Sequence, residues 1–144
     1  MAESHDAGTR LQGIIRRNRA SDPVGVYAVC SAHPQVLSAA ARESRENQSV
    51  LHVESTSSQV NQFGGYTGQS PRQFAKFVLA IAHEAGISDD QVLLGGDHLG
   101  PFPWRREPAV IAMEKARALS VNVCCLATRK SILMPACLAP MTPN

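Results

Sequence analysis

Three short apolar runs, each followed by a segment with helical spacing, constrain the fold of this chain most strongly. The runs are VGVYAV at residues 24–29, VLHVES at residues 50–55 and QVLLGG at residues 91–96. Runs of this length that are rich in apolar and β-branched residues favour strands. Strands that alternate with helices imply right-handed βαβ units and a parallel sheet. The sequence therefore predicts an α/β fold, either a doubly wound sheet or a (β/α)₈ barrel.

Helices are predicted before the first run and after each of the three runs. The first two cover residues 11–19 and 35–45. The third begins at a capping box formed by Ser70 and Gln73, and Gly86 is placed to end it in a left-handed conformation. The fourth covers residues 109–119, and its apolar side is expected to contain Val110, Met113 and residues 116–119.

Length and charge exclude several classes of protein. A chain of 144 residues is one ordinary domain or a piece of a larger one. The net charge of +2 gives no electrostatic reason to expect nucleic acid or an anionic membrane as a partner. No stretch approaches the roughly 18 consecutive apolar residues of a membrane helix, and the polar start lacks the pattern of a signal peptide. We therefore predict a cytoplasmic protein.

Chemically useful side chains follow each predicted strand. Cys30 follows the first, Glu54 ends the second, and Asp97 and His98 follow the third. In parallel α/β folds, functional residues gather beyond the carboxyl ends of the strands, so these side chains are expected to converge. Cys30 is interpreted as a small buried residue rather than a nucleophile. Glu54 is either a site residue or one half of a salt bridge.

The GGDHLGP segment at residues 95–101 offers two interpretations. Asp97 would act as a general acid or base beside His98 as a ligand of a divalent metal, since imidazole suits zinc. Alternatively, the pair only hydrogen-bonds the loop, because the surrounding glycines and prolines already explain a chain reversal.

The polar segment STSSQVNQFGGYTGQ at residues 55–69 is too long for an ordinary connection between a strand and a helix. Gly64 and Gly65 permit positive φ and a close approach of the backbone, and Asn61 and Gln62 offer donors and acceptors to hydroxyl or phosphate groups. Binding is slightly favoured over the alternative, an ordered cover in which Phe63 and Tyr66 simply pack.

Three motifs give the chain a specific resemblance. VCSAHPQVLSAA, HVESTSSQVNQFGGYTG and LLGGDHLGP, in this order, resemble the Z subunits of D-tagatose-1,6-bisphosphate aldolase over residues 11–119. The resemblance implies the N-terminal half of a (β/α)₈ TIM barrel of the class II aldolase type.

The resemblance also implies a function in galactitol or N-acetylgalactosamine catabolism through tagatose 6-phosphate. The implied role is that of an accessory, non-catalytic subunit that supports the activity and stability of a catalytic, zinc-dependent Y subunit. A metal-dependent sugar-phosphate 4-epimerase or aldolase remains the alternative. Asp97 and His98 resemble the acid/base Asp and the first zinc-binding His of catalytic class II aldolases, which implies Zn²⁺ in the full-length parent of this chain. Sugar phosphate would contact Glu54 and the loop residues Asn61, Gln62, Gly64 and Gly65.

The end of the chain departs from this resemblance. The family continues with a fourth strand similar to KIHLDASMPCADDP, whereas this chain reads SVNVCCLATRKSILMPACLAPMTPN from residue 120. Codons permitted for residues 130–143, regrouped from the third nucleotide, translate as IHLDASMPCADDP. We therefore interpret residues 1–119 as the first part of a barrel and residues 120–144 as a frameshifted tail. Because a TIM barrel needs ~250 residues, we expect this chain by itself to be a nonfunctional fragment.

Overall fold

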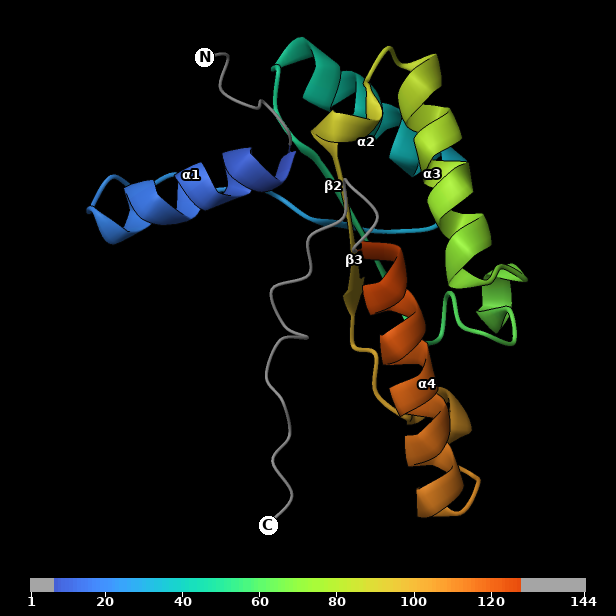
Figure 1. Cartoon of the computed structure of the whole chain (residues 1–144). Helices are drawn as coiled ribbons and strands as arrows, with labels where there is room; N and C mark the ends of the chain where they lie inside the picture. Colours follow the sequence, from blue (N-terminus) through green and yellow to red (C-terminus); the bar gives the residue numbers. More distant parts are fainter. Residues whose placement is uncertain (1–6, 128–144) are drawn as a thin grey trace.

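A parallel three-stranded sheet organises residues 7–127, the part of the chain that the computed structural model describes (Figure 1). The strands β1, β2 and β3 lie side by side in chain order and span Val29–Cys30, Leu51–Thr56 and Val92–Asp97. Val29 pairs with Val53, and Val53 pairs with Leu94. The prediction of an α/β fold with a parallel sheet is confirmed.

Strand β1 is much shorter than the predicted run at residues 24–29. The pairing of Val29 with Val53 would place residue 24 opposite Gln48 if the ladder continued. Gln48 has φ of 51°, in the left-handed region, where a strand cannot continue. The ladder therefore cannot extend to residue 24, whereas residues 27 and 28 lie outside β1 although Leu51 and His52 of β2 would be opposite them. The other two strands lie within one residue of their predicted ends.

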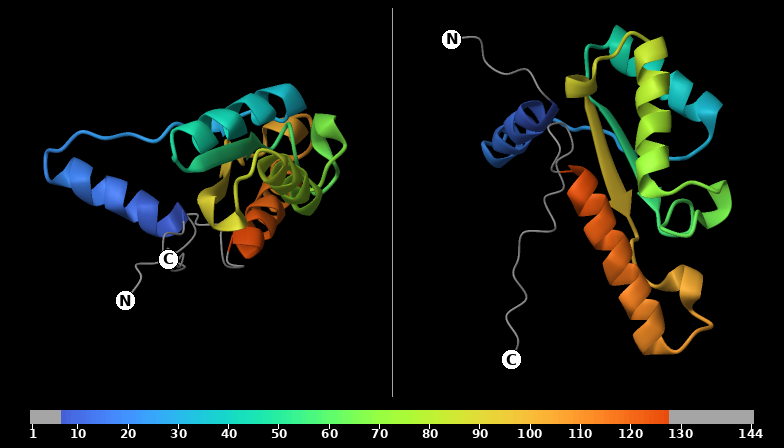
Figure 2. Two further views of the ribbon diagram at one scale, coloured as in Figure 1. Left: turned by 90° about the horizontal axis from the view of Figure 1, so that it is seen from above. Right: turned by 45° about the vertical axis from the view of Figure 1, so that its right-hand side comes forward.

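Helices α2 (Pro34–Glu46) and α3 (Pro71–Glu84) cover one face of the sheet (Figure 2). Strand residues alternate between the two faces, so every second side chain of β2 packs under these helices. The resulting core includes the following side chains: Leu37, Ala41, Leu51, Val53, Phe74, Val78, Val92 and Leu94. This packing fixes which residues of β2 and β3 point to the opposite face.

Helix α3 begins and ends as its sequence predicts. The Gln73 side chain accepts a hydrogen bond from the Ser70 backbone N–H at 2.9 Å, and the reciprocal capping contact is also present. Gly86 has φ of 78° and follows the helix end, where the N–H of Ile87 bonds the carbonyl of Ala82. These contacts satisfy backbone groups that a helix leaves unpaired at its ends.

The opposite face of the sheet is covered only near the amino ends of the strands. Helix α1 (Ala7–Arg19) places Ala7 against Val50 and Leu93 there, with Leu11 packed beside them. The rest of α1 extends away from the sheet (Figure 1). Within the described residues, the carboxyl ends of β2 and β3 therefore present the side chains of this face without a covering helix.

Helix α4 (Ala109–Ala127) runs beyond the predicted end at Leu119 and beside β3. Its buried residues are Ala112, Ala116 and Leu119, which pack with Trp104. The prediction that Val110 and Met113 belong to the apolar side is wrong, since they are 70% and 51% exposed. The helix contacts Trp104 through small residues spaced by four, which turns Val110 and Met113 outward.

The predicted boundary after residue 119 falls inside α4, and residues 128–144 of the predicted tail lie outside the described residues. That boundary stays a prediction. None of the helices within residues 7–127 is long and apolar enough to cross a membrane.

Candidate functional site

The carboxyl ends of the strands bring together the side chains that the sequence singled out. Cys30 pairs with Glu54, and Glu54 pairs with Gly95 on β3. Asp97 lies two residues beyond Gly95, so its side chain is on the same face of the sheet as Glu54. The structure therefore places Cys30, Glu54 and Asp97 around one uncovered region, as expected from a parallel sheet.

Glu54 has an imidazole partner that sequence analysis missed. His52 Nε2 lies 3.4 Å from Glu54 Oε1, and the two side chains are 20% and 26% exposed. Both residues occur on β2 two positions apart, and this period of two is the signal that would have revealed the pair. Of the two interpretations of Glu54, the salt bridge thus has a partner in place, which carries a charge only when the His52 imidazole is protonated.

Asp97 and His98 interact directly. His98 Nδ1 lies 2.7 Å from Asp97 Oδ2, and the His98 side chain is 84% exposed. His98 has φ of 49°, and its carbonyl accepts a hydrogen bond from the Ser57 hydroxyl at 2.9 Å. The backbone of the pair thus supports the loop, as the second interpretation held. Because Asp97 engages Nδ1, Nε2 is the ring nitrogen turned to an external ligand.

Cys30 differs from its prediction, because it is exposed rather than buried. Partial burial of the thiol raises its pKa, and the negative charges of Asp97 and Glu54 add to this shift. The Cys30 Sγ atom lies 3.8 Å from Oε1 of Gln59, to which it donates a weak hydrogen bond. A raised pKa disfavours the thiolate, so the site does not activate this cysteine as a nucleophile.

The loop between β2 and α3 is tightly held by its own side chains. Asn61 is buried, its Nδ2 donates to the carbonyl of Ser57 at 2.8 Å, and its Oδ1 accepts from the N–H of Phe63 at 2.8 Å and of Gly65 at 3.2 Å. These bonds engage both polar atoms of the Asn61 side chain. Asn61 therefore stabilises the conformation of the loop. Its side-chain polar atoms are already engaged, so a ligand bound here would contact the loop backbone instead.

Gly64 and Gly65 turn this loop with φ of 103° and 56°. A Cβ atom at Gly65 would lie 2.4 Å from the carbonyl oxygen of Gln59, which is closer than such atoms come. Both glycines therefore adopt the positive φ predicted for them, and Gly65 in addition has no space for a side chain because the Gln59 backbone lies against it.

Gln62 links the loop to helix α4. Its Nε2 donates to the carbonyl of Lys115 at 2.9 Å, and its Oε1 is buried without a hydrogen-bond partner. Lys115 Nζ lies 2.6 Å from Glu107 Oε2 and 5.3 Å from the centre of the Phe63 ring. The sequence alone does not predict this contact, which depends on how the loop between β2 and α3 packs against α4.

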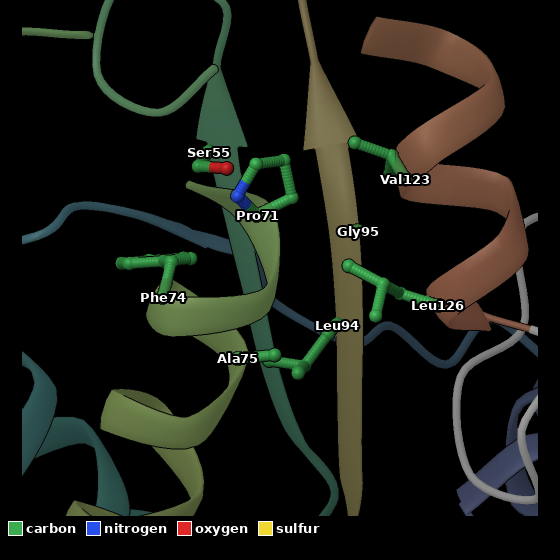
Figure 3. A pocket seen from close by; sticks show the side chains of 8 residues that line it. All are labelled: Ser55, Pro71, Phe74, Ala75, Leu94, Gly95, Val123 and Leu126. Atoms are coloured by element: carbon green, nitrogen blue, oxygen red, sulfur yellow. The ribbon is translucent and has the colours of Figure 1, made fainter. Parts of the chain in front are cut away.

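A small apolar gap lies between α3, α4 and the sheet (Figure 3). Its lining residues are Ser55, Pro71, Phe74, Ala75, Leu94, Gly95, Val123 and Leu126. Ser55 contributes the one polar side chain, and no side chain expected to bind substrate lines it. We interpret this gap as imperfect packing between helices.

A metal site would need more ligands than this part of the chain provides. Among residues 7–127, no group of three His, Cys, Asp or Glu side chains is arranged to hold a metal ion. The Asp97–His98 contact nevertheless has the form that orients a metal-bound imidazole, with a carboxylate on one ring nitrogen and the other left for the ion. These residues fit one ligand of a zinc site and its supporting carboxylate.

Similar proteins identify the family. The family model described as D-tagatose-1,6-bisphosphate aldolase subunit GatZ/KbaZ-like matches residues 11–137. A D-tagatose 6-phosphate 4-epimerase of Agrobacterium fabrum is 49% identical over 109 residues, which are 76% of this chain and 26% of that protein. The D-tagatose-1,6-bisphosphate aldolase subunit GatZ of Salmonella newport is 48% identical over 106 residues, which are 74% of this chain and 25% of that protein.

A solved structure is also similar to this chain in sequence and in fold. The crystal structure of a probable tagatose 6 phosphate kinase from Sinorhizobium meliloti 1021 matches with a TM-score of 0.68 and 44% identity. The match covers 71% of this chain and 26% of that one. The chain thus spans about a quarter of the length of these relatives. It belongs to the GatZ/KbaZ-like family of D-tagatose-1,6-bisphosphate aldolase subunits.

Proposed function

We propose that the chain corresponds to the first part of an accessory subunit of D-tagatose-1,6-bisphosphate aldolase. The observation that carries this proposal is the 48% identity with the GatZ subunit of Salmonella newport over 106 residues. The full-length subunit would support the activity and stability of a catalytic Y subunit, in the cytoplasm, during breakdown of galactitol or N-acetylgalactosamine. The parallel sheet with outer helices supports the N-terminal half of a (β/α)₈ barrel as its architecture.

The strand-end side chains have catalytic roles in the alternative, in which the full-length protein is itself a metal-dependent enzyme. Glu54 and the loop that contains Gln62, Gly64 and Gly65 would contact a sugar phosphate, and Asn61 would hold that loop in shape. Asp97 would move protons, and His98 Nε2 would provide one ligand for Zn²⁺, which supplies Lewis-acid stabilisation of an enolate-like species when bound. The close Asp97–His98 contact and the shared face of Asp97 and Glu54 support these assignments.

A 4-epimerase is the second candidate function. The 49% identity with the D-tagatose 6-phosphate 4-epimerase of Agrobacterium fabrum favours it. The two carboxylates, Glu54 and Asp97, each lie beside an imidazole on the same region of the sheet. Carboxylate–imidazole pairs can transfer protons, as an epimerisation requires. They can equally bind a substrate in an accessory subunit.

We also propose that the reading frame shifts near residue 119. The regrouped codons of residues 130–143 support this proposal. Sequencing the coding DNA across residues 113–144 tests it. We expect the DNA to contain ATC CAT CTT GAT in the shifted frame. DNA without those codons would contradict the proposed frameshift.

Enzyme assays separate the two candidate functions. The accessory proposal predicts that the frame-restored protein raises cleavage of D-tagatose 1,6-bisphosphate by a catalytic Y subunit and has no turnover alone. The epimerase alternative predicts conversion of D-tagatose 6-phosphate by the frame-restored protein without a partner, with loss of that activity in Asp97→Asn. Asp22→Asn, a substitution on the exposed segment after α1, is the matched control.

A further inference from the structure

Two neighbouring loops at the carboxyl end of the sheet expose large aromatic side chains. Phe63, Tyr66 and Phe102 are 66%, 73% and 63% exposed. The loops touch through Phe63 and Trp104, whose ring centres lie 6.1 Å apart in an edge-to-face arrangement. Figure 2 shows both loops, which contain the short helices η1 (Gly65–Thr67) and η3 (Phe102–Trp104), on the same side of the molecule.

These loops and the first turns of α3 contain more cations than carboxylates. Residues 57–76 and 99–108 contain the cations Arg72, Lys76, Arg105 and Arg106 and a single carboxylate, Glu107. Glu107 is already neutralised by Lys115 at 2.6 Å. The Arg105 guanidinium lies 4.4 Å from the centre of the Phe102 ring. The segments that carry the exposed rings therefore contain more cations than carboxylates, and Arg105 lies directly over one of the rings.

The aromatic surface is held in place before any partner arrives. The Thr67 hydroxyl donates to the carbonyl of Gln59 at 2.7 Å, and the N–H of Tyr66 bonds the carbonyl of Ser58 at 2.9 Å. Gln62 ties the same loop to α4 through the carbonyl of Lys115. Because the backbone is already ordered, association would not carry the entropic cost of folding a loop.

We propose that Tyr66, Phe102 and Arg105, with Phe63 beside them, form a docking surface for an acidic, partly apolar face of the catalytic Y subunit. This inference rests on the proposed accessory function. Aromatic residues and arginine are enriched where proteins bind one another, and rings exposed together on rigid loops mark such places. The local cations select a partner face that is rich in Asp and Glu.

Single-stranded nucleic acid is the other partner that aromatic rings and arginine attract. The geometry favours protein, because a cation already lies over one face of Phe102 and over one face of Phe63. Those faces are therefore less available for base stacking, whereas the ring edges and the Tyr66 side chain can still pack against another protein.

Binding of a purified catalytic Y subunit, measured by calorimetry, tests the docking surface. The 144-residue chain is compared with a Tyr66→Ser/Phe102→Ser/Arg105→Glu variant. These positions are exposed, so the core is unchanged, and circular dichroism confirms the fold of each variant. The control is Ile15→Ser/Arg19→Glu on α1, which removes an exposed apolar side chain and a cation elsewhere. A single-stranded RNA oligonucleotide is titrated in parallel.

The expected result is binding that weakens about tenfold or more in the loop variant and remains unchanged in the control. Raising the salt concentration should weaken binding to the wild-type chain. Equal binding by the wild-type chain and the loop variant would overturn the docking surface and leave the accessory function intact. No binding by the wild-type chain would also overturn the docking surface, whereas the accessory function fails only if the frame-restored protein does not raise cleavage by the Y subunit. RNA binding that the loop substitutions abolish, without binding of the subunit, would also overturn the proposal.

Discussion

Gly95 on β3 faces Glu54 on β2 so closely that a Cβ atom at Gly95 would lie 3.2 Å from Cγ of Glu54. The same atom would lie 3.3 Å from Nε2 of His52. The glycine therefore leaves the space in which the His52–Glu54 pair is held. A residue that looks like loop punctuation in the sequence is in fact part of the packing around a candidate site residue.

Gly95→Val should destabilise the chain by crowding Glu54 and His52. We expect a loss of about 1–3 kcal/mol in the free energy of unfolding, which exceeds the gain from a β-branched residue in a strand. Urea unfolding followed by circular dichroism measures this loss. Gly100→Val is the control, since no atom lies within 4 Å of a Cβ atom there. Equal unfolding midpoints for the two variants would contradict the packing argument.

Gly65→Ala should cost more stability than Gly68→Ala. Both glycines have positive φ, 56° and 73°, so both substitutions carry the strain of a left-handed backbone, about 1 kcal/mol. At Gly65 the new Cβ atom would also lie 2.4 Å from the Gln59 carbonyl oxygen, whereas the space at Gly68 is open. Thermal unfolding of both variants measures the difference. A Gly68 variant as unstable as the Gly65 variant would show that backbone strain alone matters.

Asn61→Ala should loosen the loop between β2 and α3. The substitution removes an acceptor for two backbone N–H groups and leaves the Ser57 carbonyl without its donor, at a cost of about 1–3 kcal/mol. Asn47→Ala, which removes an exposed bond to Glu43, is expected to change stability by less than about 0.5 kcal/mol. Hydrogen exchange of the Phe63 and Gly65 amides should accelerate only in the Asn61 variant. Unchanged exchange at those amides would show that the loop does not depend on this side chain.

Cys30 should react slowly with iodoacetamide at mildly alkaline pH, because its raised pKa keeps the thiol protonated. The shift stabilises the fold below the unfolded-state pKa, and this contribution is lost as the pH rises through the folded pKa. Asp97→Asn removes a negative charge and should speed alkylation, while Asp22→Asn should not. Mass spectrometry of the Cys30 peptide gives the rate. Alkylation that is equally slow in Asp97→Asn would exclude Asp97 as a cause of the shift.

Sequence patterns predicted the elements well where local rules decide them. The Ser70–Gln73 capping box and Gly86 mark both ends of α3 because their hydrogen bonds lie within a few residues. The length of β1 was overestimated, and the left-handed backbone of Gln48, on another segment, accounts for the loss of pairing only at the start of the run. The outward turn of Val110 and Met113 depends on the contact of α4 with Trp104.

The sequence predicted which residues of the candidate site lie together but not the contacts that their side chains make. A parallel sheet gathers strand ends, so the approach of Cys30, Glu54 and Asp97 followed from the order of elements. The pairing of Glu54 with His52 and the contact of Gln62 with Lys115 were missed. Both depend on side-chain geometry or on the meeting of distant loops, which spacing along the chain does not encode.

The accessory function and the docking surface proposed above together imply that this chain binds the catalytic Y subunit without supporting its activity. This implication is tested most directly by adding the chain to a catalytic Y subunit supported by the intact Salmonella newport GatZ and measuring cleavage of D-tagatose 1,6-bisphosphate. The account predicts that cleavage falls as the chain concentration rises, because the chain displaces the intact subunit. Unchanged cleavage at saturating chain, or turnover of D-tagatose 6-phosphate by the chain alone, would contradict it.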